Sequence, residues 1–170
     1  MIFLSQRMVH SYHRKNALAY AKEWSFKRNP AYYDFSDIGG DCTNFISQCV
    51  YAGSKVMNYN PYSGWYYNSA SSRSASWAGV NFFYEFIVNN KGPGPFAGEV
   101  SSQESLLPGD VIQLGNEARG WYHSLLVLET GPAYEDVLIA THTYDAYRRA
   151  LSTYTFEKIR WLHIEGVHQP

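Results

Sequence analysis

The segment Lys91-Gly92-Pro93-Gly94-Pro95 divides the sequence into two parts with different hydrophobic patterns. Glycine and proline at this density interrupt regular structure, so a helix or strand should end before residue 91. Before the segment, apolar residues recur three or four positions apart, as on one face of a helix. After it, short apolar runs are separated by turn residues, as in strands. Helices followed by strands predict an α+β fold in which N-terminal helices pack on an antiparallel sheet.

The helical pattern has recognisable ends. Asn29-Pro30 should end the first helix, Asp41 is a candidate N-cap for the second, and Gly53 is its candidate C-terminal cap. Residues 54–75 have no clear period and predict a long irregular loop. The expected helices are 14–27, 42–52 and about 77–88. The expected strands are 111–114, 123–129, 137–143 and 158–165.

Length and charge restrict the class of protein. The 170 residues fit one domain, taken here as 1–170. With 14 Lys and Arg against 15 Asp and Glu, the chain lacks the basic field that a nucleic-acid binder needs. No apolar run approaches the roughly 18 residues of a transmembrane segment, and Met1–Arg7 is too short for a signal-peptide core. A cytoplasmic protein and a domain of a longer exported protein both remain open.

The two cysteines, Cys42 and Cys49, lie in the same expected helix. Seven residues separate their Cα atoms by about 10.5 Å, which is too far for a disulfide. Cys42 follows Gly39-Gly40-Asp41 at the helix start, where free N–H groups and the helix dipole should lower its pKa and could bind an oxyanion. A buried structural cysteine is the alternative for Cys42, and Cys49 should belong to the core.

A nucleophilic cysteine needs a base, and two histidines are candidates. His123 opens an expected strand, and His142 lies 19 residues later, near the end of the next. In an antiparallel hairpin these positions are neighbours, so His142 could hold the ring of His123. Cys42 and the two histidines could also bind zinc, although their spacing matches no familiar zinc signature.

The segment GGDCTNFISQC, residues 39–49, resembles the core motif of the putative amidase domain family of Firmicutes. The resemblance covers about residues 10–165. Further matching segments are Tyr20-Ala21-Lys22-Glu23-Trp24, Arg28-Asn29-Pro30, Gly64-Trp65-Tyr66-Tyr67, Trp77-Ala78-Gly79-Val80, Pro108-Gly109-Asp110, Tyr122-His123-Ser124 and Thr141-His142-Thr143-Tyr144-Asp145.

That family is similar to the CHAP and NlpC/P60 groups of papain-like peptidases and amidases. In those groups a cysteine opens a helix packed on an antiparallel sheet, a histidine starts the next strand, and a third polar residue follows on the strand after it. The resemblance therefore implies a papain-like fold with Cys42 as nucleophile, His123 as base and His142 as the residue that orients His123.

The same resemblance implies a cysteine-dependent amide hydrolase, a peptidoglycan amidase or endopeptidase acting on the wall or on a wall-derived peptide, with no metal or organic cofactor. A non-catalytic wall-binding domain on the same fold and a zinc-dependent hydrolase are the alternatives.

Some further residues could take part, each with a structural alternative. Asp145 could replace His142 as third member or bind substrate, although a turn residue of this type is common. Tyr32 or Tyr33 could assist an oxyanion, and Arg148 or Arg149 could bind a substrate carboxylate. The aromatic residues that could line a cleft, or else fill the core, are Trp65, Tyr66, Trp121 and Tyr122.

Overall fold

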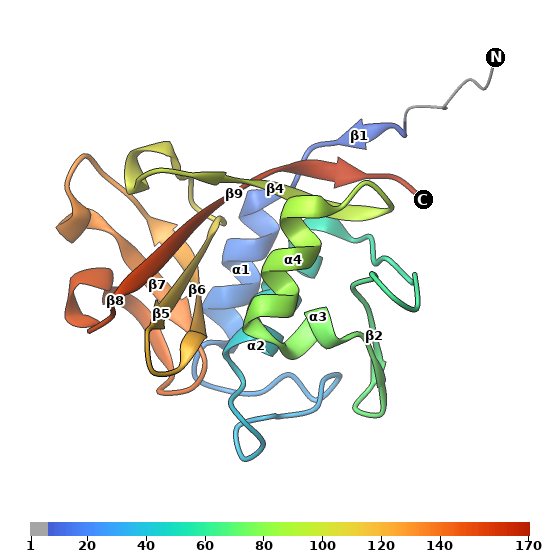
Figure 1. Cartoon of the computed structure of the whole chain (residues 1–170), viewed down its shortest axis with the longest axis horizontal. Coiled ribbons are helices and arrows are strands. Elements are labelled where there is room, and N and C mark those ends of the chain that lie inside the picture. Colours follow the sequence, from blue (N-terminus) through green and yellow to red (C-terminus); the bar gives the residue numbers. More distant parts are fainter. Residues whose placement is uncertain (1–6) are drawn as a thin grey trace.

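Helices and strands form two layers in the computed structural model, which describes residues 7–170 (Figure 1). The helices are α1 (Arg14–Trp24), α2 (Cys42–Ser54), α3 (Ala75–Ala78) and α4 (Val80–Asn89). The strands are β1 (Val9–His10), β2 (Tyr67–Ser69), β3 (Ser72–Arg73), β4 (Gly94–Val100), β5 (Val111–Asn116), β6 (Gly120–Glu129), β7 (Leu138–Thr141), β8 (Ala146–Ala150) and β9 (Lys158–His168). Three 3-10 turns are η1 (Gln103–Ser105), η2 (Tyr134–Asp136) and η3 (Leu151–Thr153). The expectation about a signal-peptide core falls on the start of the chain, where residues 1–6 lie outside the described residues.

The main sheet has the strand order β1-β9-β5-β6-β7-β8, and β4 pairs with the other edge of β9. Each of these pairings is antiparallel, which confirms the α+β class predicted from the order of the patterns. The short strands β2 and β3 form a separate hairpin. Within residues 7–170, every helix is too short or too polar to cross a bilayer.

The two faces of the sheet carry two separate apolar clusters. On the helical face, Phe45, Ile46 and Cys49 of α2 are fully buried with Leu126 of β6. Cys49 is therefore a core residue, as the sequence predicts. On the opposite face, a second cluster packs under the turns that connect the later strands; it includes Leu106, Leu114, Leu125, Val127, Ile139 and Leu151.

Several element boundaries differ from those expected. The expected helix 77–88 is two helices, because Gly79 has an extended backbone with φ −101° and ψ 128°. The expected loop 54–75 contains the β2–β3 hairpin. Besides the short strands β1, β2 and β3, the strands β4 and β8 were not expected. β4 begins inside the glycine-proline segment at Gly94, whose φ is +102°.

The sequence predicts that Gly53 caps the C-terminus of α2, but the helix does not end there. It continues to Ser54 and is closed by Lys55 with a left-handed φ of 57°. Gly53 has a packing role instead, because a Cβ atom there would lie 2.4 Å from Cε2 of Tyr12. The glycine therefore permits close contact between α2 and the N-terminal segment.

Candidate active site

Cys42 is the first residue of α2, and hydrogen bonds join this helix start to β6. The Oγ1 atom of Thr43 lies 2.9 Å from the Oγ atom of Ser124, and Nε2 of Gln113 donates to the same Oγ atom over 3.2 Å. The backbone of Ser124 also acts on the Cys42 thiol, in the direction that lowers its pKa. Because His123 immediately precedes Ser124, these contacts bring the backbone of His123 near the start of α2.

The pKa of Cys42 is raised, so the lowered value expected at a helix start is wrong. Burial is the largest cause, and the negative charge of Asp41 acts in the same direction. Hydrogen bonds from Ser124 and Thr43 favour the thiolate but do not outweigh burial. Cys42 is therefore a neutral thiol at neutral pH, and the nucleophilic role expected of it would require a base.

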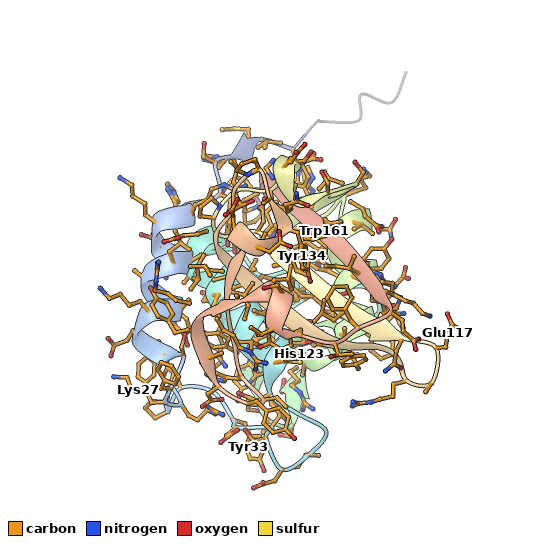
Figure 2. The ribbon with its side chains drawn as sticks, turned by 90° about the vertical axis from the view of Figure 1, so that its left-hand side faces the viewer. Lys27, Tyr33, Glu117, His123, Tyr134 and Trp161 are labelled. Atoms are coloured by element: carbon orange, nitrogen blue, oxygen red, sulfur yellow. The ribbon has the colours of Figure 1, made fainter. Side chains whose placement is uncertain are left out.

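His123, the histidine expected to act as the base, is labelled in Figure 2. Its residue is 8 % exposed, and its pKa is lowered from 6.5 to about 4 by burial and by the positive charges of Arg149 and Arg119. The imidazole is therefore neutral at neutral pH and can accept a proton. Its ring packs against the Tyr154 ring, with centroids 5.7 Å apart.

The expected hydrogen bond between His142 and His123 is not formed, because the strand register differs by one residue. Leu126 pairs with Ala140 and Val127 with Ile139. Continuing this register sets His142 against Ser124 rather than His123, and a one-residue offset reverses the face to which a side chain points. His123 shares its face with its cross-strand partner Leu114 in the second cluster, whereas His142 lies on the helical face.

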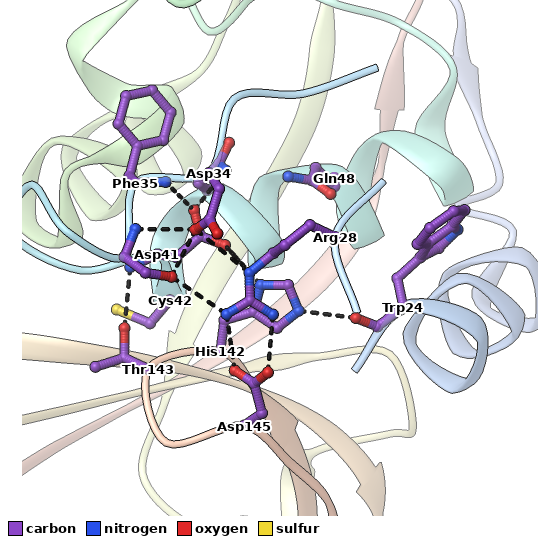
Figure 3. A network of polar contacts seen from close by, with 12 residues as sticks. Trp24, Arg28, Asp34, Phe35, Asp41, Cys42, Gln48, His142, Thr143 and Asp145 are labelled. Carbon is purple, nitrogen blue, oxygen red and sulfur yellow. Dashed lines mark hydrogen bonds and ion pairs between the residues drawn. The ribbon is translucent and has the colours of Figure 1, made fainter. Parts of the chain in front are cut away.

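Both ring nitrogens of His142 have other partners (Figure 3). Its Nδ1 atom is 2.6 Å from Oδ2 of Asp41, and its Nε2 atom is 2.8 Å from the backbone oxygen of Trp24. The ring stacks on Phe45 with centroids 4.0 Å apart. The two ring nitrogens thus face a carboxylate and a carbonyl oxygen from two different segments of the chain. His142 therefore anchors the start of α2.

Asp41 occupies the N-cap position but does not cap its helix with its side chain. Its Oδ1 atom accepts hydrogen bonds from the N–H of Phe35 at 2.9 Å and from Nδ2 of Asn44 at 2.8 Å. Its own N–H donates to Oγ1 of Thr143 over 2.9 Å. Within residues 7–170, no acceptor is paired with the N–H of Cys42, which is thus available to an incoming group.

Asp145 does not contact the His123 ring either. It accepts two hydrogen bonds from the Arg28 guanidinium, at 2.8 and 3.0 Å. The Nε atom of Arg28 also lies 3.3 Å from Asp34 and 3.6 Å from Asp41. Asp145 therefore joins the turn after β7 to the loop before α2, on the same network as His142 (Figure 3).

The four aromatic residues expected to line a cleft have different environments. Trp65 is fully buried and its Nε1–H donates to Ser47, so it belongs to the core and cannot form a cleft wall. Tyr66 lines a cavity of about 1080 Å³ that neither Cys42 nor His123 lines. Trp121 lies under the Arg160 guanidinium, and the Tyr122 hydroxyl donates to the backbone oxygen of Thr155. Only these last two adjoin His123 in β6.

The two tyrosines suggested as oxyanion donors sit beside α2. Tyr32 stacks on Trp77, with ring centroids 5.8 Å apart. Tyr33 packs edge-on against Phe35, and its backbone oxygen accepts a hydrogen bond from Asn44. The sequence pattern gave no indication of Tyr154, which packs on His123 from the segment after η3.

The zinc alternative requires Cys42, His123 and His142 to converge. His142 instead uses both nitrogens within the Asp41 network. Across residues 7–170, no group of three or more His, Cys, Asp or Glu side chains is arranged to hold a metal ion.

Comparison with known proteins places these residues in a wider context. The family model described as "Putative amidase domain" matches residues 11–165. The chain is 39 % identical over 140 residues to "Uncharacterized protein YhbB" of Bacillus subtilis (strain 168). The match covers 81 % of this chain and 43 % of that protein, so the chain spans less than half of the relative's length. No solved structure matches.

Proposed function

The chain belongs to the putative amidase domain family, and we propose that it is a cysteine-dependent hydrolase of amide bonds in peptidoglycan or wall-derived peptides. The description of the family as an amidase domain points to hydrolysis of amide bonds. The cysteine mechanism rests on one observation above all: Cys42 opens α2, and the next residue, Thr43, lies 2.9 Å from Ser124, which follows a buried, neutral histidine on β6. A cysteine at a helix start packed on an antiparallel sheet is also the papain-like arrangement that we propose for this fold.

In the proposed reaction, His123 removes the proton from the Cys42 thiol as the sulfur attacks the carbonyl carbon. His123 then gives this proton to the leaving amine, and water hydrolyses the thioester. A raised thiol pKa and a histidine pKa of about 4 favour the neutral pair before substrate binds, so proton transfer accompanies the attack.

Negative charge develops on the carbonyl oxygen during the attack. The N–H of Cys42 is the proposed donor to this oxygen, because it lies at the start of a 13-residue helix and has no acceptor within residues 7–170. Loss of one such donor typically costs about 3 kcal/mol of transition-state stabilisation.

His142 has a different role from the one implied by the resemblance. It holds Asp41, whose backbone precedes the nucleophile, and so acts as a positioning residue. Asp145 supports the same loop through Arg28. The proposed reacting pair is therefore Cys42 and His123, with His142 and Asp145 fixing the loop that presents Cys42.

The charges near His123 are compatible with a peptide substrate. Arg119 and Arg149 both lower the pKa of His123, so both place positive charge near the reacting groups. Positive charge at this position would attract a peptide that carries free carboxylates. Tyr122 and Trp121 adjoin His123 along β6 and are the proposed contacts for the rest of the substrate.

Digestion of purified peptidoglycan, followed by mass analysis of the products, tests this function. Wild type should release fragments with new amino and carboxyl ends, and Cys42→Ala should release none. Cys49→Ala is the matched control, because Cys49 lies two turns further along α2 in the core and should leave digestion intact. Binding without cleavage by wild type would favour a wall-binding domain, and loss of activity on chelation would favour the zinc alternative.

A further inference from the structure

The hydroxyl of Tyr154 is buried without a hydrogen-bond partner within residues 7–170. A buried hydroxyl that makes no hydrogen bond has lost its water contacts without compensation, so its position needs an explanation. Three other buried side-chain atoms share this condition: Arg28 Nε, Ser54 Oγ and His168 Nδ1. Arg28 faces two carboxylates, and the other two atoms lie on residues outside the candidate site.

Tyr154 packs beside His123, the proposed base. Its ring packs on that of His123 with centroids 5.7 Å apart, and a charge on Cys42 acts on its hydroxyl. The hydroxyl without a partner therefore belongs to a side chain that packs directly on the proposed base.

The hydroxyl keeps its proton and is available as a donor. Burial raises the pKa of Tyr154, although Arg149 acts in the opposite direction. The Arg149 guanidinium lies over the Tyr154 ring, 4.0 Å from its centroid, and its Nε atom donates to Thr153. Arg149 carries no acceptor, so it cannot accept the hydrogen of Tyr154.

We propose that Tyr154 is a catalytic residue. Its hydroxyl donates a hydrogen bond to the oxyanion formed when Cys42 attacks a carbonyl group. This proposal rests on the proposed function and adds a second donor to the N–H of Cys42. In the step concerned, the Cys42 sulfur bonds to the carbonyl carbon, its proton passes to His123, and the carbonyl π electrons move onto oxygen. Tyr154 donates a hydrogen bond without losing its proton, and the leaving group departs when the carbonyl re-forms.

Two reagents that react with the same sulfur separate this role from general thiol reactivity. 4-Nitrophenyl acetate acylates a cysteine through a tetrahedral oxyanion, whereas iodoacetamide alkylates it by displacement at carbon and forms no oxyanion. Both rates should be measured at Cys42 by mass spectrometry, in wild type and in Tyr154→Phe. Tyr134→Phe is the control, because its hydroxyl lies 3.5 Å from the Leu151 oxygen and it belongs to η2 (Figure 2).

Tyr154→Phe should slow acylation roughly 10- to 100-fold, because removal of an oxyanion donor lowers the rate of a reaction that forms an oxyanion. The rate of alkylation should stay within about twofold of wild type. The variant's melting temperature should not fall, since the hydroxyl removed has no partner. Unchanged acylation would overturn the role of Tyr154 and leave Cys42 as nucleophile. An equal fall in both rates would overturn it too, because Tyr154 would then act on the thiol. Wild-type Cys42 inert to both reagents would overturn the proposed function itself.

Discussion

The Nδ1 atom of His142 lies 2.6 Å from the Oδ2 atom of Asp41, the residue immediately before the candidate nucleophile. Asp41 is fully buried, so its carboxylate depends on partners from other parts of the chain. The turn after β7 supplies one of them, His142, and Thr143 of the same turn accepts a hydrogen bond from the backbone N–H of Asp41. The position of Cys42 is thus set by a segment about 100 residues away in the sequence.

Replacing His142 by Ala should lower the free energy of unfolding by about 3 kcal/mol, because it leaves a buried carboxylate without its shortest contact. Urea unfolding at pH 7 measures this change. His163→Ala is the matched control, since its Nδ1 atom is 2.7 Å from Asp110 but its side chain is 28 % exposed. Asp110 also keeps its ion pair with Arg14, so that change should cost about 1 kcal/mol. Equal losses would contradict the anchoring role of His142.

Folding stability should depend on the protonation of His123. Its pKa is about 4 when folded and 6.5 when exposed, so between these values the unfolded chain binds the extra proton. The contribution of His123 to the free energy of unfolding is fully present above pH 6.5. It is lost as the pH falls toward 4, by about 3 kcal/mol in total. Unfolding curves of wild type and His123→Phe across pH 4–7 isolate the effect. Parallel pH dependence in the two proteins would show that His123 is not buried in its neutral form.

The acid limb of the hydrolysis profile should follow the same group. Neutral His123 can accept the thiol proton, so kcat/KM should fall with a midpoint near pH 4 rather than 6.5. Arg149→Gln removes a positive charge that lowers this pKa, and its midpoint should move to higher pH. A wild-type midpoint near 6.5 would assign the base to a more exposed histidine.

The α+β class and the core position of Cys49 could be predicted from the sequence, because both follow from local periodicity. The position of Cys42 at the start of a helix followed from the glycines before it. The strands β4 and β8 were not predicted. β4 begins within a glycine-proline segment, and β8 contains Arg148 and Arg149, so neither has the apolar alternation that marks a half-buried strand.

The partners of the candidate site could not be predicted, because they depend on register and on distant contacts. A one-residue change in the pairing of β6 with β7 separates His142 from His123, and no local pattern determines that register. Asp41 has the sequence pattern of an N-cap, yet its carboxylate binds residues on both sides of the helix start and on a distant turn. The pKa of Cys42 depends likewise on burial, which the helix start alone does not reveal.

Cys42 should react with iodoacetamide faster than Cys49, which is fully buried in the core. The pKa of both thiols is raised by burial, so the rate at Cys42 should still be increasing as the pH passes 9. Mass spectrometry of peptides labelled between pH 6 and 10 gives both rates. A plateau in the Cys42 rate below pH 8 would mean that the thiolate is stabilised despite burial.

Asp145→Asn should leave hydrolysis within a few-fold of wild type, because Asp145 binds Arg28 rather than His123. It should cost about 1 kcal/mol of unfolding free energy, since a two-point arginine contact is lost at a site that is partly exposed. Ser36→Ala tests a weaker contact of the same guanidinium, at 3.2 Å, and should cost less. A loss of activity as large as that of His123→Ala would return the third catalytic role to Asp145.

The last turn of α2 allows a test of packing with two adjacent residues. In Gly53→Ala the new Cβ would lie 2.4 Å from the ring of Tyr12, whose hydroxyl is held by the Gly109 oxygen, so the ring cannot move freely. We expect a loss of about 2 kcal/mol, even though alanine favours the helix. Ser54→Ala is the matched control, because its buried hydroxyl has no partner within residues 7–170 and its removal should be neutral or stabilising. Thermal unfolding of the two variants measures the difference, and a more stable Gly53→Ala would mean that Tyr12 does not pack against α2 as described.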